Sequence, residues 1–274
     1  MSLLTVDREK CKRDGICIAV CPMGIIEIKA EGDYPTMIAG GNQWCISCGH
    51  CVAVCPHAAM AHAGMHPDDC QPLQEDHLLS VEQVVQFMQA RRSIRQYKNK
   101  AVNREVLAKL IDVARFAPSG HNTQPVRWLV IYDSGEVYRL AGIVIDWMRS
   151  LIRQNSPLVA SLHLDRVVAA WEAGKERICR GAPHVIVAHG RKDSRTAPAA
   201  STIALTHLEL AAGAFGLGAC WAGYFNTAAN SWPPMADALN LPQGHVCFGA
   251  MMIGFPKFKY HRLPLRNEAK ITWR

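Results

Sequence analysis

The sequence of 274 residues predicts an α+β protein built from two unequal domains. Seven of the eleven cysteines lie within residues 11–55. Residues 1–79 carry 5 Lys/Arg and 10 Asp/Glu, a net charge of −5, whereas residues 80–274 carry 25 and 13, a net charge of +12. From residue 80 onward, helical patterns alternate with short apolar runs. A small acidic domain therefore precedes a basic domain in which helices flank a central sheet.

The domain boundaries follow from composition. We expect a cysteine-rich domain over residues 1–66, a linker over 67–79, where His, Pro, Asp and Gln gather, and a second domain over 80–274. No secretory signal opens the sequence, and its longest uncharged apolar run, residues 210–225, is short for a membrane span. Basic runs interleaved with aromatic residues, typical of nucleic-acid binding, are also missing. We expect a cytoplasmic protein that binds neither nucleic acid nor membranes.

The second cysteine cluster, CISCGHCVAVCP at residues 45–56, has the spacing of an iron–sulfur motif. Cys45, Cys48 and Cys51 stand three residues apart, so one wrapping loop can supply three corners of an iron–sulfur cube. A fourth cysteine, Cys55, follows four residues later and precedes a proline. In proteins with two clusters, this fourth cysteine ligates the other cluster.

The first cluster, CKRDGICIAVCP at residues 11–22, repeats this spacing with one change. Cys11, Cys17 and Cys21 occupy three of the four positions, and Asp14 occupies the position of the second ligand. A carboxylate is a harder donor than a thiolate and suits iron–sulfur chemistry less well. Three kinds of metal site are open: a four-iron cluster with Asp14 as a ligand, a three-iron cluster that lacks this corner, or a site that interconverts between the two. Alternatively, Asp14 only caps the turn at residues 14–15 and binds no metal.

Structural zinc is the alternative for these cysteines, but zinc sites usually pair ligands across a long loop. Residues 1–66 instead resemble a bacterial-type two-cluster ferredoxin. By that resemblance one cluster, of the 4Fe-4S type, takes Cys21, Cys45, Cys48 and Cys51. The other, 4Fe-4S or 3Fe-4S, takes Cys11, Asp14, Cys17 and Cys55. The four remaining cysteines stand outside these motifs, and we expect no metal at Cys70, Cys179, Cys220 or Cys247.

The second domain begins with a helix signal. Ser80 and Gln83 are spaced as a capping box, and a second helix is predicted between Asn103 and Pro118. The remaining elements are read from apolar patterns. Strands are predicted at Val126–Tyr132, His184–Ala188 and Val246–Ile253, and longer helical patterns at 161–180 and 198–218.

Four segments of this domain carry a further signal: RRSIRQY at 91–97, APSGHNTQP at 117–125, GLGACWAGYF at 216–225 and IGFPKFKYHRLPL at 253–265. The clustered arginines of the first suit a phosphate, because guanidinium forks bind it through paired hydrogen bonds. No G-x-G-x-x-G follows a predicted strand, so a Rossmann dinucleotide site is not expected. In this order the segments resemble the FMN-dependent nitroreductase family, with a central mixed sheet flanked by helices. The whole chain resembles a ferredoxin–nitroreductase fusion.

That resemblance implies a homodimer with FMN at the subunit interface. The segment around the FMN phosphate and ribityl chain corresponds to Arg91, Arg92, Ser93 and Arg95. The loop that reaches a flavin, generally the partner's, corresponds to Pro118, Ser119 and Asn122, and the segment facing the isoalloxazine ring to Trp221, Ala222 and Gly223. Arg262 corresponds to a late phosphate-binding arginine. Tyr260 stands where a basic residue is usual, and we expect Lys259 to substitute for it. No side chain is assigned as a catalytic acid or base.

The combination predicts an oxidoreductase. Because iron–sulfur clusters carry single electrons and hydride-type reduction uses two, a flavin is the natural junction between them. We expect electrons to pass from the clusters to FMN and on to a nitroaromatic, quinone or similar conjugated acceptor, with a low-potential protein as donor. The alternatives are direct reduction of FMN by NAD(P)H, with the clusters relaying electrons outward, or a non-enzymatic electron-transfer or redox-sensing module.

Overall fold

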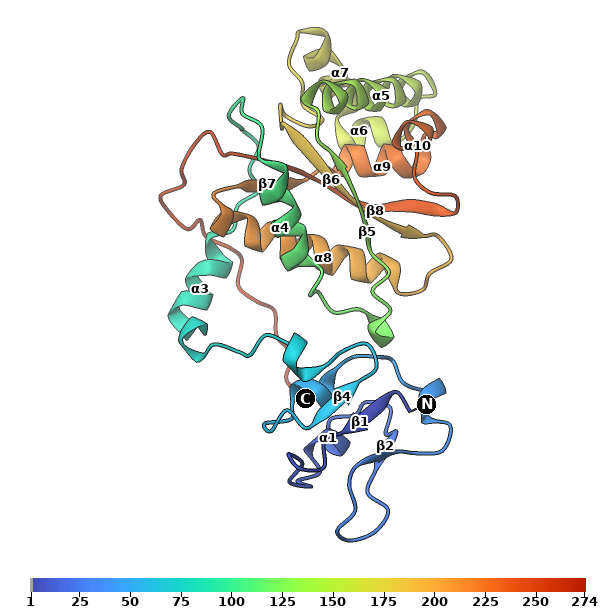
Figure 1. Cartoon of the computed structure of the whole chain (residues 1–274). Helices are drawn as coiled ribbons and strands as arrows, with labels where there is room; N and C mark the ends of the chain where they lie inside the picture. The colour runs from blue at the N-terminus through green and yellow to red at the C-terminus, as the bar shows by residue number, and fades with distance from the viewer. Residues whose placement is uncertain (1) are drawn as a thin grey trace. The chain divides into compact units, whose positions relative to one another are not determined.

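The computed structural model describes residues 2–274, which separate into two compact units (Figure 1). The first unit runs to Leu78 and includes His121–Thr123. The second comprises Leu79–Gly120 and Gln124–Arg274. Among residues 2–274, none of the helices has the length and apolarity that crossing a membrane requires.

The first unit is small and consists of two similar halves. Its short helices, α1 (Ile16–Ala19) and α2 (His50–Ala53), each follow a glycine with positive φ, Gly15 at 73° and Gly49 at 75°. This left-handed conformation is easy for glycine and turns each cysteine loop into its helix. Two antiparallel pairs complete the unit: β1 (Leu4–Val6) with β4 (Met60–His62), and β2 (Ile26–Glu27) with β3 (Thr36–Met37). Short 3₁₀ turns lie at η1 (Gly41–Gln43), η2 (Pro67–Asp69) and η3 (Glu75–His77).

The second unit is built on a four-stranded sheet in the order β5-β6-β8-β7. Its strands are β5 (Arg127–Ile131), β6 (His184–Arg191), β7 (Gly218–Trp221) and β8 (His245–Gly254). The predicted α+β class is confirmed. A mixed sheet was expected, however, and within residues 2–274 every pairing of this sheet is antiparallel. Apolar runs locate strands in a sequence but do not encode their direction, which is set by the connections.

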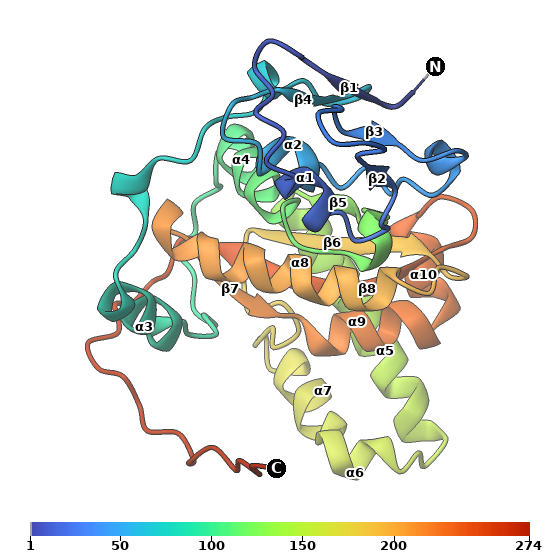
Figure 2. The same ribbon diagram turned by 90° about the horizontal axis from the view of Figure 1, so that it is seen from below.

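Helices cover both faces of this sheet (Figures 1 and 2). Successive strand residues point to opposite faces, so Val185 and Val187 enter one core whereas Ile186 and Ala188 enter the other. The helices of the first core are α5 (Ser134–Arg153), α7 (Leu164–Glu172), α9 (Gly223–Ser231) and α10 (Pro233–Leu239), and those of the second are α4 (Arg104–Ala114) and α8 (Ala197–Ala212). The remaining helical elements are α3 (Val81–Ala90), η4 (Gly120–Asn122), α6 (Leu158–Leu162) and η5 (Gly213–Phe215).

Several helix ends match the sequence and others do not. The capping box of α3 is present, with the backbone of Gln83 donating to the Ser80 hydroxyl. The helix expected over 198–218 instead ends at Ala212, because Gly216 (φ 69°) turns the chain into β7. The helix expected over 161–180 ends at Glu172, where Gly174 (φ 74°) closes it.

Candidate functional site

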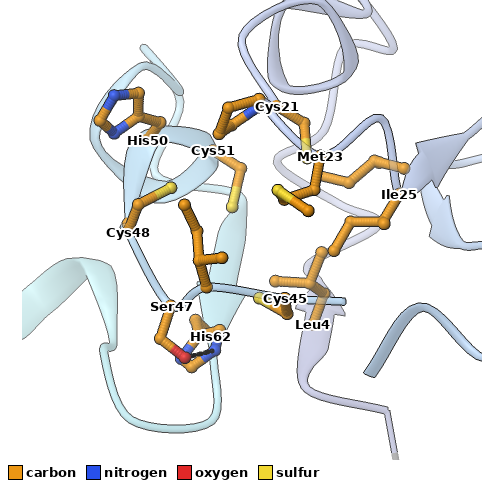
Figure 3. Close-up of a pocket in the computed structure, with 14 residues that line it drawn as sticks. Leu4, Cys21, Met23, Ile25, Cys45, Ser47, Cys48, His50, Cys51 and His62 are labelled. Carbon is orange, nitrogen blue, oxygen red and sulfur yellow. Dashed lines mark hydrogen bonds between the residues drawn. The ribbon is translucent and has the colours of Figure 1, made fainter. Parts of the chain in front are cut away.

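Four cysteines surround one pocket of the first unit (Figure 3). Cys45 and Cys48 come from the loop that leads into α2, Cys51 comes from α2 itself, and Cys21 comes from the other half of the unit. The apolar side chains of Leu4, Met23, Ile25 and Ile26 complete the lining. The structure thus brings together one of the two ligand sets expected from the sequence.

A second pocket gathers the other set. Cys11 and Cys17 flank it from the first cysteine loop, and Cys55 comes from the second loop. Asp14 also lines this pocket. Each half of the unit therefore lends its last cysteine to the pocket of the other half.

In neither thiol pocket do the candidate ligands converge closely enough to bind a single metal ion. Among residues 2–274, no three His, Cys, Asp or Glu side chains are arranged to hold one metal ion. The thiols instead face one another across a pocket. The corners of a multi-iron cluster need that spacing, because each thiolate binds a different iron.

The side chain of Asp14 has two roles open to it. Its Oδ1 accepts a hydrogen bond from the backbone N–H of Ile16 at 3.2 Å, which is the capping role. Its carboxylate also faces the pocket shared with Cys11, Cys17 and Cys55. A carboxylate has two oxygens, so the turn does not use up its capacity to bind a metal.

In both thiol pockets, burial favours the protonated thiol over the thiolate. Burial, together with smaller contributions from the neighbouring Cys11 and Asp14, raises the pKa of the Cys17 thiol to about 11. Burial likewise raises the pKa of Cys51, with Cys48 adding to the rise. These thiols would remain protonated without a positively charged partner. Bound iron would supply that charge and would release the thiol protons.

His62 also lines the first pocket, and the cysteine spacing gives no sign of it. Its Nδ1 accepts from the backbone N–H of Gly64 at 3.1 Å, so the neutral ring carries its proton on Nε2. Nε2 lies 3.3 Å from the hydroxyl of Ser47 (Figure 3). This ring packs beside the loop of Cys45 and Cys48 because β4 passes there.

The second unit contains a groove of about 680 Å³, within the usual range of small-molecule pockets. Arg91 and Arg92 line it from the end of α3, and Lys259 and Tyr260 from the segment after β8. Lys259, the expected substitute for a basic residue at 260, lines the same groove. Arg262, further along, is not among the lining residues.

The RRSIR segment packs against β7. The backbone N–H of Ile94 donates to the carbonyl of Ala219 at 2.9 Å, and a Cβ at Gly218 would overlap the side chain of Ile94. Arg91 donates to the carboxylate of Glu209 at 2.8 Å and lies 3.4 Å from the Ser93 hydroxyl. Glu209 was not foreseen, because it lies more than a hundred residues from Arg91 in the sequence.

The other expected flavin residues lie apart from one another, and one of them belongs to the first unit. Trp221 ends β7 with its side chain 36% exposed, and the backbone N–H of Ala222 donates to Ala250 before Gly223 begins α9. Ser119 lines a separate pocket beside α4. Asn122 belongs to the first unit, where its side chain donates to the carbonyls of Ile46 and Ser47. Pro118, Ser119 and Asn122 thus do not line one groove with Arg91.

Comparison with known proteins identifies both parts of the chain. The nitroreductase family model matches residues 88–255, and a 4Fe-4S dicluster domain model matches residues 3–56. An Archaeoglobus fulgidus protein named for NADH dehydrogenase and NAD(P)H nitroreductase activity is 21% identical over 183 residues, covering 65% of this chain and 87% of its own.

Solved structures agree in fold. A nitroreductase with bound FMN from Bacteroides fragilis superposes with a TM-score of 0.58 at 19% identity, covering 69% of this chain and 97% of its own. A second, from Desulfitobacterium hafniense, gives 0.57 at 22% identity, covering 69% and 96%.

The fold and the paired thiol pockets define an iron–sulfur oxidoreductase. The nitroreductase match spans more than half of the chain, and the chain belongs to the nitroreductase family, with a ferredoxin-type domain preceding the family's own fold.

Proposed function

We propose that this chain is an iron–sulfur flavoprotein oxidoreductase. It passes electrons from two ferredoxin-type clusters to FMN and on to a nitroaromatic, quinone or similar conjugated small molecule. The supporting observation is that a single chain joins two pockets, each lined by four expected cluster ligands, to the nitroreductase fold. Iron–sulfur clusters carry single electrons. A flavin beside them could take up these electrons one at a time and then reduce a substrate by two electrons.

The proposed ligands follow the two pockets. Cys21, Cys45, Cys48 and Cys51 hold a 4Fe-4S cluster, and Cys11, Asp14, Cys17 and Cys55 hold a 4Fe-4S or 3Fe-4S cluster. Apolar walls around the first pocket exclude water and thereby influence the reduction potential of the bound group.

For FMN, the groove beside α3 supplies what a phosphate needs. Arg91, Arg92 and Lys259 line it, and Arg guanidinium groups bind phosphate oxygens in pairs. Arg95, the segment 221–223 and the loop 118–122 remain proposed contacts to the rest of the cofactor. Bound FMN would accept electrons singly and deliver them in pairs. Relatives of this fold carry FMN, which supports the assignment.

We further propose a homodimer with FMN at the interface. The apolar side chains of α3 are exposed, with Val81 at 75% and Met88 at 52%. The segment after β8 is also exposed and carries Leu265 at 98% and Trp273 at 86%. Apolar surface of this extent on two segments is typical of a protein–protein interface. A cytoplasmic location and a low-potential donor protein complete the proposal.

A second candidate is direct reduction of the flavin by NAD(P)H, with the clusters relaying electrons outward. The name of the Archaeoglobus fulgidus relative favours it.

An anaerobic absorbance titration separates the two. NADH, then NADPH, then dithionite are added to the purified protein while the flavin band is followed. Bleaching by dithionite alone supports the ferredoxin domain as the electron entrance. Bleaching by a nicotinamide supports the second candidate. A protein that binds neither iron nor flavin under reducing, anaerobic reconstitution contradicts both.

A further inference from the structure

A separate cavity of the second unit is lined by six residues, four of which are charged. It has a volume of about 570 Å³ and lies against the loop that joins α7 to β6. Its lining residues are Gln96, Lys175, Glu176, Arg177, Arg180 and Gly181. Three of these six carry a positive charge and one a negative charge, and the cavity shares no lining residue with the groove beside α3.

Glu176, the single acidic residue of this cavity, forms hydrogen bonds within its own loop. The carboxylate of Glu176 accepts hydrogen bonds from the backbone N–H groups of Ile178, Cys179 and Gly181, the last two at 2.7 and 2.8 Å. It makes no ion pair with an arginine in the part of the chain that the structure describes. Lys175, Arg177 and Arg180 likewise form no ion pair there, so three positive charges are left facing one cavity.

The loop is built to hold these charges in place. At its start, Gly174 closes α7 and the N–H of Lys175 returns to the carbonyl of Ala170 at 2.8 Å. In its middle, Ile178 and Cys179 are buried at 2% and 1% exposure and anchor the loop in the core. Arg180 has a φ of 58°, a left-handed conformation that few non-glycine residues adopt and that often marks a functional position.

The cavity lies beside the proposed flavin segment. Burial raises the pKa of the Cys220 thiol in β7, and the positive charges of Arg95 and Arg180 both oppose that rise. Arg95 and Arg180 also act together on Tyr97, whose pKa burial raises. Gln96, which lines the cavity, directly follows Arg95, and Ile94 of the same segment donates its backbone N–H to Ala219 in β7, directly before Cys220 and the segment 221–223.

We propose that the loop 175–181 forms an anion subsite that binds the phosphate of a phosphorylated small molecule at the edge of the flavin site. Arginine forks match the paired oxygens of a phosphate, and a loop fixed before binding loses little entropy when the anion arrives. The subsite itself depends only on residues 175–181 and Gln96. Its relation to a redox ligand rests on the proposed function.

Inorganic pyrophosphate is the first probe, titrated calorimetrically into the flavin-loaded full chain. We expect the double variant Arg177→Gln/Arg180→Gln to bind it at least tenfold more weakly. The matched control, Arg139→Gln/Arg191→Gln, removes the same charge from exposed arginines paired with Glu136 and Asp193 and should stay within about twofold of the parent. Equal weakening in both variants, or no binding by the parent, overturns the proposal.

A third variant separates a built site from a diffuse positive field. Glu176→Gln adds one unit of positive charge but leaves a side chain with a single acceptor oxygen for three N–H groups. A built subsite predicts weaker binding of pyrophosphate by this variant, and tighter binding overturns it. Flavin content is measured in every sample by absorbance. Loss of flavin from the Arg177→Gln/Arg180→Gln variant would assign the cavity to the cofactor itself and also overturn the proposal.

The source of the phosphate is identified by comparing NAD⁺ with NADP⁺. Preference for NADP⁺ that is lost in the Arg177→Gln/Arg180→Gln variant assigns the subsite to a phosphomonoester of a dinucleotide. Equal binding of both, tighter than pyrophosphate, assigns it to the diphosphate bridge. Pyrophosphate binding that neither dinucleotide exceeds assigns it to another phosphorylated ligand. A parent protein that binds no flavin would contradict the proposed function but not the subsite, which is measured independently.

Discussion

The guanidinium of Arg91 donates to the carboxylate of Glu209 across 2.8 Å, and the two side chains are 27% and 8% exposed. This ion pair lies on the wall of the groove proposed to hold the FMN phosphate. Glu209 orients the guanidinium, but it also offsets part of the charge that would attract a phosphate. The ion pair therefore stabilises the fold, whereas only Arg91 is expected to attract the phosphate of the cofactor.

We predict that Arg91→Ala both releases flavin and destabilises the second unit, because it leaves the buried Glu209 carboxylate without its partner. The stability cost is about 1–3 kcal/mol. Adding Glu209→Gln should recover most of the lost melting temperature without restoring flavin. Flavin absorbance after gel filtration and thermal unfolding check this. Full flavin retention in Arg91→Ala/Arg95→Ala, with clusters intact, would contradict the phosphate assignment.

Lys259 and Arg262 provide a second test of the groove. Lys259 lines it together with Arg92, whereas Arg262 is not among its lining residues. Lys259→Ala should weaken FMN binding about tenfold, the effect of losing one charge-assisted hydrogen bond. Arg262→Ala should weaken it less. Fluorescence titration of flavin-free protein measures both, and the reverse order would return the phosphate contact to Arg262.

Removal of one cysteine should remove one cluster. We expect Cys48→Ala to lose about half of the iron, since each cluster depends on a separate set of four ligands. The flavin should remain bound. Cys70→Ala is the matched control, because Cys70 is half-buried in the same unit but lines neither thiol pocket. Iron analysis distinguishes them, and an equal loss in both variants would contradict the ligand assignment.

Asp14 can be tested by separating its two roles. Asp14→Asn keeps an oxygen for the N–H of Ile16 but removes the negative charge, and Asp14→Cys supplies a thiolate. If Asp14 faces iron, we expect Asp14→Cys to convert any three-iron signal into a four-iron signal and Asp14→Asn to change the spin signal. Unchanged iron content and spectra in both variants would leave only the capping role.

We predict that protonation of His184 lowers the stability of the second unit at acidic pH. The Nε2 of this imidazole accepts from the backbone N–H of Val102 at 2.9 Å, its Nδ1 faces the carbonyl of Tyr132, and burial lowers its pKa from 6.5. The unfolded chain binds the proton more readily, so the contribution of the His184 contacts to stability is fully present above pH 6.5 and is lost as the pH falls through the lower pKa of the folded state. His184→Ala should cost about 1–3 kcal/mol at neutral pH. It should also flatten the pH dependence of the unfolding midpoint between pH 7.5 and 5.5, and parallel profiles would contradict this role.

The thiol pockets were accessible from the sequence, because ligand spacing is local and each motif also fixes its turn, as Gly15 and Gly49 show. The positions of β5, β6 and β8 were likewise predicted from apolar runs, whereas β7 was missed because the helical pattern was extended to residue 218. The partnership of Arg91 with Glu209 was not, since it joins residues far apart in the chain. The basic loop was also missed, because its character depends on Glu176 folding back onto backbone N–H groups. The order of charges in the sequence does not show that the Glu176 carboxylate binds backbone N–H groups and, within residues 2–274, leaves the neighbouring basic side chains unpaired.

The position of β8 has a consequence for synthesis of the chain on the ribosome. β8 pairs with both β6 and β7, so the last strand to be made fills an interior place in the sheet. The β1–β4 pair of the first unit, in contrast, is complete once residue 62 has emerged. The iron–sulfur unit therefore acquires its own strands while the second unit still waits with an open sheet edge. Such an edge is prone to wrong pairing, and a slow final step of translation prolongs that exposure.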